Sequence, residues 1–197
     1  ILALADTEPI MEDLLQYRFK DGRLKDQSFG NLFLAAMAGI SDNFEEAVQK
    51  MSSVLAVTGK VIPVTLDNMQ LIAKFQNGNV VEGESQIPEE AIKQNSRIEE
   101  LRINPEDAKP LKEALEAIRE ADAIVMGPGS LYTSITPNLL VKDIAKEVRK
   151  SDAIKIYISN IMTQPGETTD FKVSDHLKVL IKYGGKNIVD YAIVNTG

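Results

Sequence analysis

A loop rich in glycine and hydroxyl side chains follows the apolar run 123–126, and its residue types suit anion binding. The loop contains Gly127, Pro128, Gly129, Ser130, Tyr132, Thr133 and Ser134. Glycines let a backbone approach a ligand closely and present its N–H groups, and hydroxyls add further donors, so this loop can cradle a phosphate. A plain turn between a strand and a helix needs similar glycines, so the spacing leaves both interpretations open.

A second polar segment, 160–168, follows the apolar run 154–159. It is long for a connection between a strand and a helix, and long ordered loops are often functional. Asn160 and Thr163 are its candidate ligand-facing residues, although an irregular surface loop would have the same composition. Asn195 lies in a third segment of this kind, after the apolar run 188–194, and it is a further candidate.

The titratable residues indicate no metal cluster and no catalytic constellation. The chain has no cysteine and one histidine, which excludes thiolate sites and sites built from several histidines. That histidine, His176, falls in the first turn of a predicted helix, where the helix N-terminus lowers a histidine pKa and favours a neutral donor for a ligand. A histidine on the surface is the alternative. Asp6 is the best lone carboxylate candidate, and we assign no catalytic residue and no metal ligand.

The elements that would position these loops alternate between strand and helix. Apolar runs at 123–126, 154–159 and 188–194 are separated by helical patterns at 136–148 and 174–183. This order predicts a Rossmann-like α/β fold of three layers, α/β/α, with a mostly parallel sheet and helices on both faces. Ligands bind outside the carboxyl ends of such strands, so the first two loops should converge on one cleft. The strand residues Ile124, Val125, Ile156 and Ile158 should be nearly fully buried.

The first half of the chain has a different pattern. Helices are predicted from Thr7-Glu8-Pro9, over 31–38 as a buried helix, and from Ser41-Asp42. A β-rich insertion is predicted over about 61–103, with strands at 61–66, 69–75 and 97–103. Within it, Asn77-Gly78 is typical of a two-residue hairpin turn. Both ends of the chain fall within patterned sequence, so we expect residues 1–197 to be part of one larger domain.

Composition narrows the function classes. The formal net charge is −7, and a nucleic-acid binder needs a basic surface, so that class is disfavoured. The sequence has no signal peptide and no apolar run near the roughly 20 residues needed to span a bilayer. These features predict a soluble, cytoplasmic protein.

Several long motifs resemble one family. They are ALADTEPIMEDLLQYRF at 3–19, GNLFLAAMAGI at 30–40, KPLKEALEAIREADAIVMGPGS at 109–130, GPGSLYTSITPNLLVKDI at 127–144 and YISNIMTQPGETTDFKVSDHL at 157–177. Together they resemble the YvcK branch, the gluconeogenesis factors, of the CofD-like family. The resemblance covers essentially the whole chain.

The resemblance implies a Rossmann-like core and a regulatory protein that binds a nucleotide such as a UDP-sugar or NAD. Such proteins are needed for cell shape and wall synthesis on gluconeogenic carbon sources. The alternative it implies is a 2-phospho-L-lactate transferase, which moves a phospholactyl group from a nucleotide-activated donor to a deazaflavin with a divalent cation. It also adds Gly30 and Asn31 to the candidate ligand residues, and it favours a homodimer.

Three departures from the family pattern affect these expectations. The family opens with a Gly-rich GGTG segment, which this chain lacks and which we expect upstream of Ile1. The family usually has L-x-G-H before GNL, whereas this chain ends the corresponding segment with Gln27, which cannot act as an acid or a base. The transferase branch typically has GPSNP after the central strand, where this chain has GPGSL, and this difference favours the gluconeogenesis-factor branch.

Overall fold

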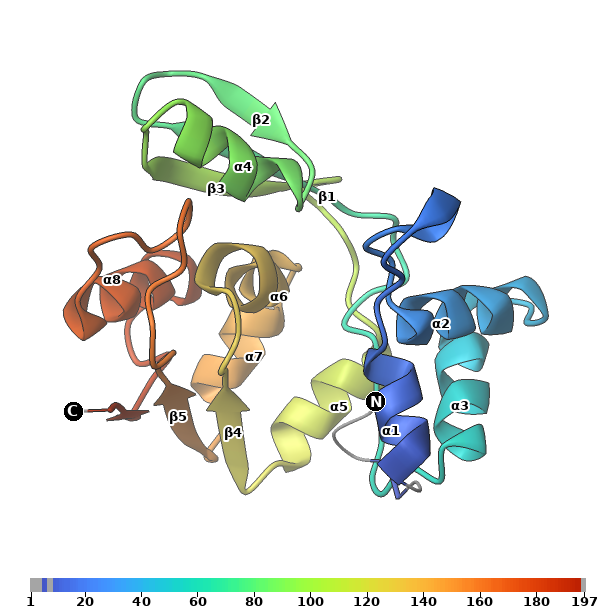
Figure 1. Cartoon of the computed structure of the whole chain (residues 1–197). Helices are drawn as coiled ribbons and strands as arrows, with labels where there is room; N and C mark the ends of the chain where they lie inside the picture. The colour runs from blue at the N-terminus through green and yellow to red at the C-terminus, as the bar shows by residue number, and fades with distance from the viewer. Residues whose placement is uncertain (1–4, 7–8, 196–197) are drawn as a thin grey trace. The chain divides into compact units, whose positions relative to one another are not determined.

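The computed structural model describes residues 5–6 and 9–195, and the chain divides into two compact units, Ile1–Pro63 and Val64–Gly197. The first unit is helical, with α1 (Pro9–Gln16), the short 3-10 helix η2 (Gly22–Leu24), α2 (Phe29–Gly39) and α3 (Phe44–Val54) (Figure 1). Its core is formed by the buried side chains of Leu15, Met51 and Leu55. Thr7 and Glu8, where α1 is predicted to start, lie outside the described residues.

Two details of the first unit differ from the sequence predictions. None of the described α2 residues is fully buried, so the predicted burial of 31–38 is wrong. The helix α3 starts slightly later than Ser41-Asp42, because the side chain of Asn43 caps it by accepting a hydrogen bond of 2.9 Å from the Glu46 N–H.

The second unit begins with an antiparallel sheet in the order β2-β1-β3. Its strands are β1 (Gln70–Phe75), β2 (Val80–Glu82) and β3 (Ile98–Asn104), and α4 (Gln86–Lys93) connects β2 to β3. On β3 the burial alternates, with Leu101 and Ile103 facing the core. This is the half-exposed strand that the sequence predicts over 97–103.

Within the β-rich segment two predictions are wrong, and one helix was not predicted. Residues 61–66 form no strand, and only Thr65 makes an isolated bridge, to Pro110. The β1–β2 hairpin exists, but five residues separate the paired Lys74 and Val80, so its turn is longer than two residues. The segment also contains a helix, α4, whose buried Ile87 and Ala91 have the i, i+4 spacing of one helix face.

The second sheet is parallel, in the order β4-β5-β6. Its strands are β4 (Ala123–Met126), β5 (Ile154–Ile158) and β6 (Tyr191–Ile193), and they match the three predicted apolar runs. The connecting helices are the π-helical turn η3 (Leu131–Ile135), α6 (Thr136–Leu140), α7 (Ile144–Lys150) and α8 (Val173–Gly184), and α5 (Lys112–Glu120) precedes β4. The mixed α/β, Rossmann-like fold with a parallel sheet is therefore confirmed.

Helices α6 and α8 lie between the two sheets of the second unit (Figure 1). One hydrophobic cluster joins all three layers, since it contains Phe75 of β1, Leu139 of α6, Tyr157 of β5 and Leu180 of α8. The hydroxyl of Tyr183 also accepts a hydrogen bond of 2.7 Å from the Leu101 N–H, which ties α8 to β3.

The predicted near-complete burial of the parallel strands is wrong. Val125 is 53% exposed, and Ile156 and Ile158 on the same face are only partly buried. On the opposite face Ile124 is partly buried and Tyr157 is fully buried. Because the strand order is sequential, successive crossover helices fall on the same face of the sheet. Among the described residues of the second unit, helices therefore cover one face rather than two.

Of the helices in the described part of the chain, none has both the length and the apolar character needed to cross a membrane.

Candidate functional site

The first two predicted loops leave the parallel sheet side by side. Met126 at the end of β4 is paired with Tyr157 of β5, so the segments that follow both strands start at the same edge of the sheet. These are residues 127–135, called the first loop below, and 159–172, called the second loop. Carboxyl ends of neighbouring parallel strands are the usual position of a ligand site in this class of fold.

Asn160 joins the two loops through its side-chain amide. Its Oδ1 atom accepts a hydrogen bond of 3.1 Å from the Gly129 N–H, and its Nδ2 group donates one of 2.9 Å to the Gly129 carbonyl. The Ser130 hydroxyl adds a third link, donating to Gln164 Oε1 at 2.7 Å. The structure thus brings together Gly129, Ser130 and Asn160, three of the residues predicted from the sequence.

Glu167 is the residue of this region that sequence reasoning missed. It is 4% exposed, and one carboxylate oxygen accepts hydrogen bonds from the Tyr132 and Thr133 N–H groups at 2.9 and 3.3 Å. Its other oxygen accepts from the Thr133 hydroxyl at 2.7 Å and from Gln164 Nε2 at 3.0 Å. The carboxylate therefore occupies N–H groups that the sequence interpretation reserved for a phosphate. The sequence signal that could have identified Glu167 is an acidic residue in a loop beside the start of a helical turn.

The two glycines of the first loop have different roles. Gly127 has φ +88°, and a Cβ atom there would lie 2.7 Å from the Ile158 carbonyl oxygen, so the backbone requires glycine at this position. Gly129 lies outside the left-handed region, and a Cβ atom there would meet only side chains, at 3.6 Å or more. Packing therefore does not explain the glycine at 129, which leaves room for close approach of a ligand.

The other predicted residues of the second unit differ in accessibility. Pro128, Ser134 and Thr163 are exposed, and so is Asn195, the last described residue. Tyr132 is buried, its ring packs edge-on against Phe171, and burial raises the pKa of its hydroxyl. The Tyr132 ring is thus part of the core, and only its backbone N–H takes part in the loop through Glu167.

His176 lies in the first turn of α8, as predicted, but it is 4% exposed, so the alternative of a surface histidine is wrong. Its Nδ1 atom is 2.8 Å from the Tyr157 hydroxyl, and the Phe171 ring packs edge-on against it with 5.7 Å between ring centres. Burial lowers the pKa of His176, because it disfavours the charged imidazolium, and the neighbouring Asp175 opposes this effect.

The single histidine should make stability depend on pH. Its folded-state pKa lies below the ordinary 6.5, so below pH 6.5 the unfolded chain binds more protons than the folded one. We expect the free energy of unfolding to be constant near pH 7.5 and to fall as the pH drops below about 6.5. Each unit of pKa difference corresponds to about 1.4 kcal/mol.

Urea denaturation at pH 7.5 and 5.5 tests this expectation. The control is His176→Asn, which places an amide near the Nδ1 position as a partner for Tyr157 but cannot titrate. The variant should lose less stability between the two pH values than the parent does. Equal losses in the two proteins would show that other groups cause the pH dependence.

Three predicted ligand residues belong to the first unit. A Cβ atom at Gly30 would lie 2.8 Å from the Leu15 carbonyl oxygen, so the packing of α2 on α1 accounts for this glycine. The Asn31 N–H donates to the Ser28 hydroxyl at the start of α2, and Asp6 is exposed. A ligand-binding role for Gly30, Asn31 and Asp6 stays a prediction.

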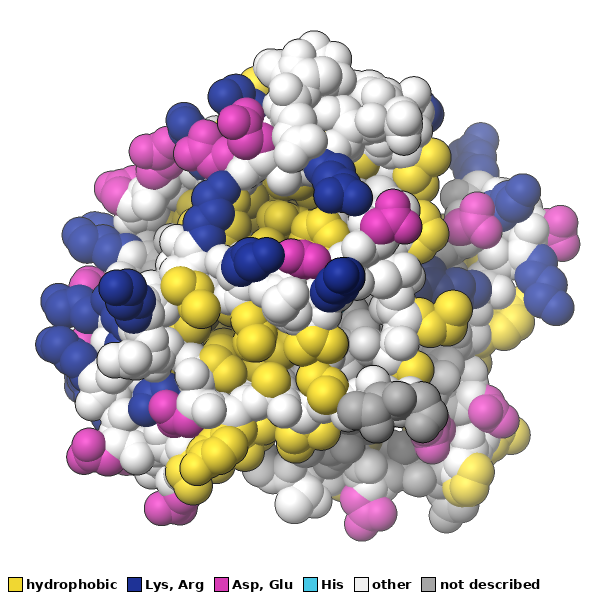
Figure 2. Space-filling model, turned by 90° about the vertical axis from the view of Figure 1, so that its left-hand side faces the viewer, with side chains coloured by type: hydrophobic (Ala, Val, Ile, Leu, Met, Phe, Trp, Pro, Cys, Tyr) yellow, Lys and Arg dark blue, Asp and Glu magenta, His cyan; other side chains and the backbone are white. Residues whose placement is uncertain are grey.

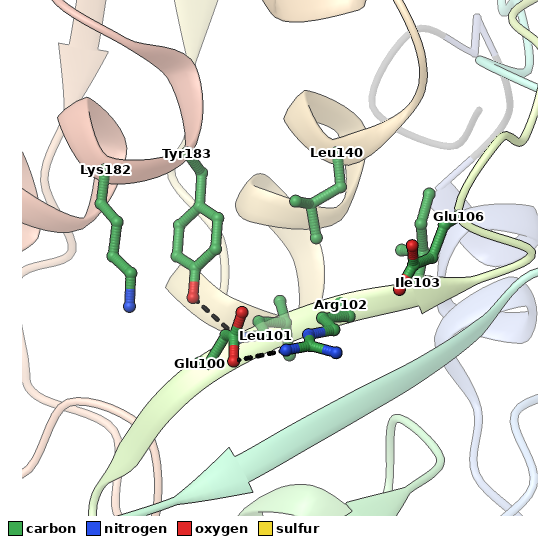
Figure 3. Close-up of a pocket in the computed structure, with 8 residues that line it drawn as sticks. All are labelled: Glu100, Leu101, Arg102, Ile103, Glu106, Leu140, Lys182 and Tyr183. Atoms are coloured by element: carbon green, nitrogen blue, oxygen red, sulfur yellow. Dashed lines mark hydrogen bonds and ion pairs between the residues drawn. The ribbon is translucent and has the colours of Figure 1, made fainter.

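A pocket of about 530 Å³ lies elsewhere in the second unit, between β3, α6 and α8 (Figure 3). Leu140 and Tyr183 line it from the C-terminal ends of α6 and α8, whereas the two loops lie at the other end of the helical layer. Its charged residues carry both signs, with Glu100 and Arg102 paired at 3.0 Å. None of the residues predicted from the sequence lines this pocket.

The described residues contain no group of three or more His, Asp or Glu side chains placed to hold a metal ion. On the face drawn in Figure 2, Lys and Arg side chains are interspersed with Asp and Glu. The fold and the joined loops define an α/β protein whose candidate ligand site lies at the carboxyl ends of parallel strands. The family described as "2-phospho-L-lactate transferase CofD" matches residues 1–197, and the chain belongs to this family.

Relatives within this family have a more specific name. The chain is 68% identical to a "Putative gluconeogenesis factor" of Clostridium acetobutylicum, with 100% of this chain and 44% of the relative aligned. It is 49% identical to the "Gluconeogenesis factor" of Bacillus subtilis, with 100% and 61% aligned. The predicted resemblance to the gluconeogenesis-factor branch is therefore confirmed, and the chain spans about half the length of these relatives.

A solved structure agrees with the fold. The crystal structure of a UPF0052-family protein from Bacillus halodurans matches with a TM-score of 0.89 at 45% identity, over 100% of this chain and 62% of that one.

Proposed function

We propose that this protein binds a nucleotide or a nucleotide-sugar, such as a UDP-sugar, and acts in the cytoplasm as a regulator of the gluconeogenesis-factor type. In this role it supports cell shape and wall synthesis on gluconeogenic carbon sources. The observation that carries the proposal is the pair of loops at the carboxyl ends of β4 and β5, joined through Asn160 and Gly129. The shared name of the relatives supports the regulatory role.

The loops suit the sugar better than the phosphates of such a ligand. The hydroxyl-bearing residues Ser134 and Thr163 are exposed and suit contacts with sugar hydroxyls. The Tyr132 and Thr133 N–H groups already donate to Glu167, the first loop contains no Lys or Arg, and the second loop contains only Lys172, at its end. The phosphates therefore need a divalent cation or basic groups beyond this one lysine.

Titration calorimetry of the full chain with UDP-sugars, NAD and GDP, with and without Mg²⁺, tests the proposal. Saturable binding of one ligand with a 1:1 ratio supports it. Failure of the whole panel to bind would contradict it.

Gly129→Val tests the position of the site. Because a Cβ atom at this position meets no backbone atom, the variant should stay folded while its side chain obstructs the ligand. The dissociation constant should rise tenfold or more, about 1.4 kcal/mol. Gly39→Ala is the control, since a Cβ atom at Gly39 in α2 meets nothing within 4 Å. A folded Gly129→Val protein that binds as tightly as the parent would show that the first loop is only a turn.

The alternative function is transfer of a phospholactyl group from a nucleotide-activated donor to a deazaflavin. The family description favours it, and phosphoryl transfer depends mainly on positioning and charge stabilisation, so it needs no nucleophilic side chain. Incubation of the protein with the donor, the deazaflavin and Mg²⁺ distinguishes the two functions. Release of the nucleotide together with a phospholactyl-deazaflavin product would establish the transferase.

We also propose a homodimer and no binding of nucleic acid. The net charge of −7 opposes binding to a polyanion. Light scattering of the purified chain tests the dimer.

A further inference from the structure

The second loop supplies an anion, the Glu167 carboxylate, to the backbone of the first loop. The Glu167 carboxylate accepts four hydrogen bonds, from two backbone N–H groups, one hydroxyl and one side-chain amide. Its partners Tyr132 and Thr133 are 35 and 34 residues away in sequence. The contact therefore joins two loops and does not merely cap its own segment.

The environment of this carboxylate is unusual for a glutamate. It is 4% exposed, and among the described residues no Lys, Arg or His forms an ion pair with it. A buried charge without a cation is tolerated only where hydrogen-bond donors replace its hydration. The four neutral donors supply that replacement, and three of them come from the first loop.

Glu167 also belongs to a chain of side-chain hydrogen bonds between the loops. The Ser130 hydroxyl donates to Gln164 Oε1, Gln164 Nε2 donates to Glu167, and Glu167 accepts from the Thr133 hydroxyl. A further bond, from the Gln164 N–H to the buried Thr168 hydroxyl at 2.8 Å, anchors this chain of hydrogen bonds in the second loop. We call Ser130, Thr133, Gln164 and Glu167 the loop-joining network.

We propose that Glu167 is a positioning residue of the nucleotide site. Its carboxylate holds the first loop in the form that binds the ligand, acting through Ser130 and Thr133 without touching the ligand itself. This inference rests on the proposed function for its ligand. Its effect on the loop can nevertheless be measured without any ligand.

Two substitutions at Glu167 distinguish the effect of side-chain length from the effect of charge. Glu167→Asp keeps the charge but shortens the side chain by one methylene, so the carboxylate no longer reaches Tyr132 and Thr133 of the first loop. Glu167→Gln keeps the reach and one accepting oxygen but loses the charge. The matched control is Glu147→Gln on α7, which removes a carboxylate with a 13% exposed side chain that pairs with Arg119 outside the loop-joining network.

The first readout is hydrogen–deuterium exchange of the full chain without ligand, at a temperature where circular dichroism shows every variant to be folded. We expect exchange of the Tyr132 and Thr133 amides to speed up at least tenfold in Glu167→Asp and by a smaller factor in Glu167→Gln. Exchange in β5 should stay as in the parent. The Glu147→Gln control should leave the loop amides unchanged.

The second readout is the dissociation constant of the UDP-sugar that the parent binds best. It should rise tenfold or more in Glu167→Asp, rise less in Glu167→Gln and stay unchanged in Glu147→Gln. A Glu167→Asp protein with a lower melting temperature but unchanged loop exchange and unchanged affinity would overturn the inference. If Glu167→Asp does not fold, unchanged loop exchange and affinity in Glu167→Gln overturn it.

The two proposals fail in different ways. If the parent binds no ligand of the panel, the proposed function fails while loop exchange still tests the role of Glu167. If the parent binds and the Glu167 variants bind equally well, the function stands and the positioning role fails.

Discussion

Replacing Phe75 by alanine is expected to lower the free energy of unfolding of residues 64–197 by about 3–5 kcal/mol. The Phe75 side chain is fully buried on β1 and belongs to the hydrophobic cluster that joins both sheets through α6 and α8. Its removal leaves a cavity where tightly packed layers meet, so neighbouring side chains can relax only partly. Because the cluster is shared, the parallel sheet should lose stability together with the antiparallel sheet.

Urea denaturation followed by hydrogen–deuterium exchange measures both effects. Ile92→Ala is the control, because Ile92 on α4 is 58% exposed and its truncation should change stability by less than about 0.5 kcal/mol. Amides of β1 and β5 should lose protection by similar factors in Phe75→Ala. Loss of protection confined to β1 would contradict a common core.

The parallel strands were predictable because the sequence pattern that specifies each of them is local. Each is a short apolar run bounded by turn residues and followed by a helical pattern, and β4 has the predicted bounds, Ala123–Met126. Their burial was not predictable in the same way. An apolar run implies that both faces are apolar, whereas Val125 is 53% exposed because the helices of this unit cover the other face.

The β-rich segment shows where local patterns are insufficient. The run 61–66 contains strand-forming residues, yet a strand needs a continuous hydrogen-bonding partner, and this run forms only an isolated bridge between Thr65 and Pro110, where the Leu111 N–H donates to the Val64 carbonyl. The helix α4 was missed because it spans eight residues between two strands, and the apolar residues of its buried face are few. Neither outcome can be read from hydrophobic periodicity alone.

The candidate site also has features that the sequence predicted and features that it did not. Residue types and the rule for parallel sheets predicted that the two loops converge, and the structure joins Gly129 and Asn160, which are 31 residues apart. The role of Glu167 was not predictable, because its partners are identified only once the second loop folds onto the first. The sequence interpretation assigned the N–H groups of the first loop to a ligand, whereas the protein uses those of Gly129, Tyr132 and Thr133 internally.

For His176 the sequence predicts the direction of the pKa shift correctly but misses its largest cause. The position in the first turn of α8 predicts a lowered pKa from the helix N-terminus. The lowered pKa is present, but its largest cause is burial of the ring near Tyr157 and Phe171. Burial of this kind depends on tertiary packing, which a single histidine in a sequence does not reveal.

Gly127→Ala should destabilise the protein by roughly 2–4 kcal/mol, whereas Gly129→Ala should change stability by less than about 1 kcal/mol. At Gly127 two costs combine, because the backbone has φ +88° and an added Cβ atom would lie 2.7 Å from the Ile158 carbonyl oxygen. That oxygen belongs to the last residue of β5, so relief of the clash must separate the ends of two paired strands. At Gly129 neither cost applies.

Thermal and urea denaturation of the two alanine variants measure this contrast between glycines two residues apart. A large loss of stability in Gly127→Ala with parent-like stability in Gly129→Ala would show that the backbone requires glycine at position 127. It would also show that folding does not require glycine at position 129. That result would also make Gly129→Val interpretable, because a loss of nucleotide affinity could then not be attributed to unfolding. Equal losses in both alanine variants would mean that the whole first loop is constrained by packing, and the case for a ligand at Gly129 would fall.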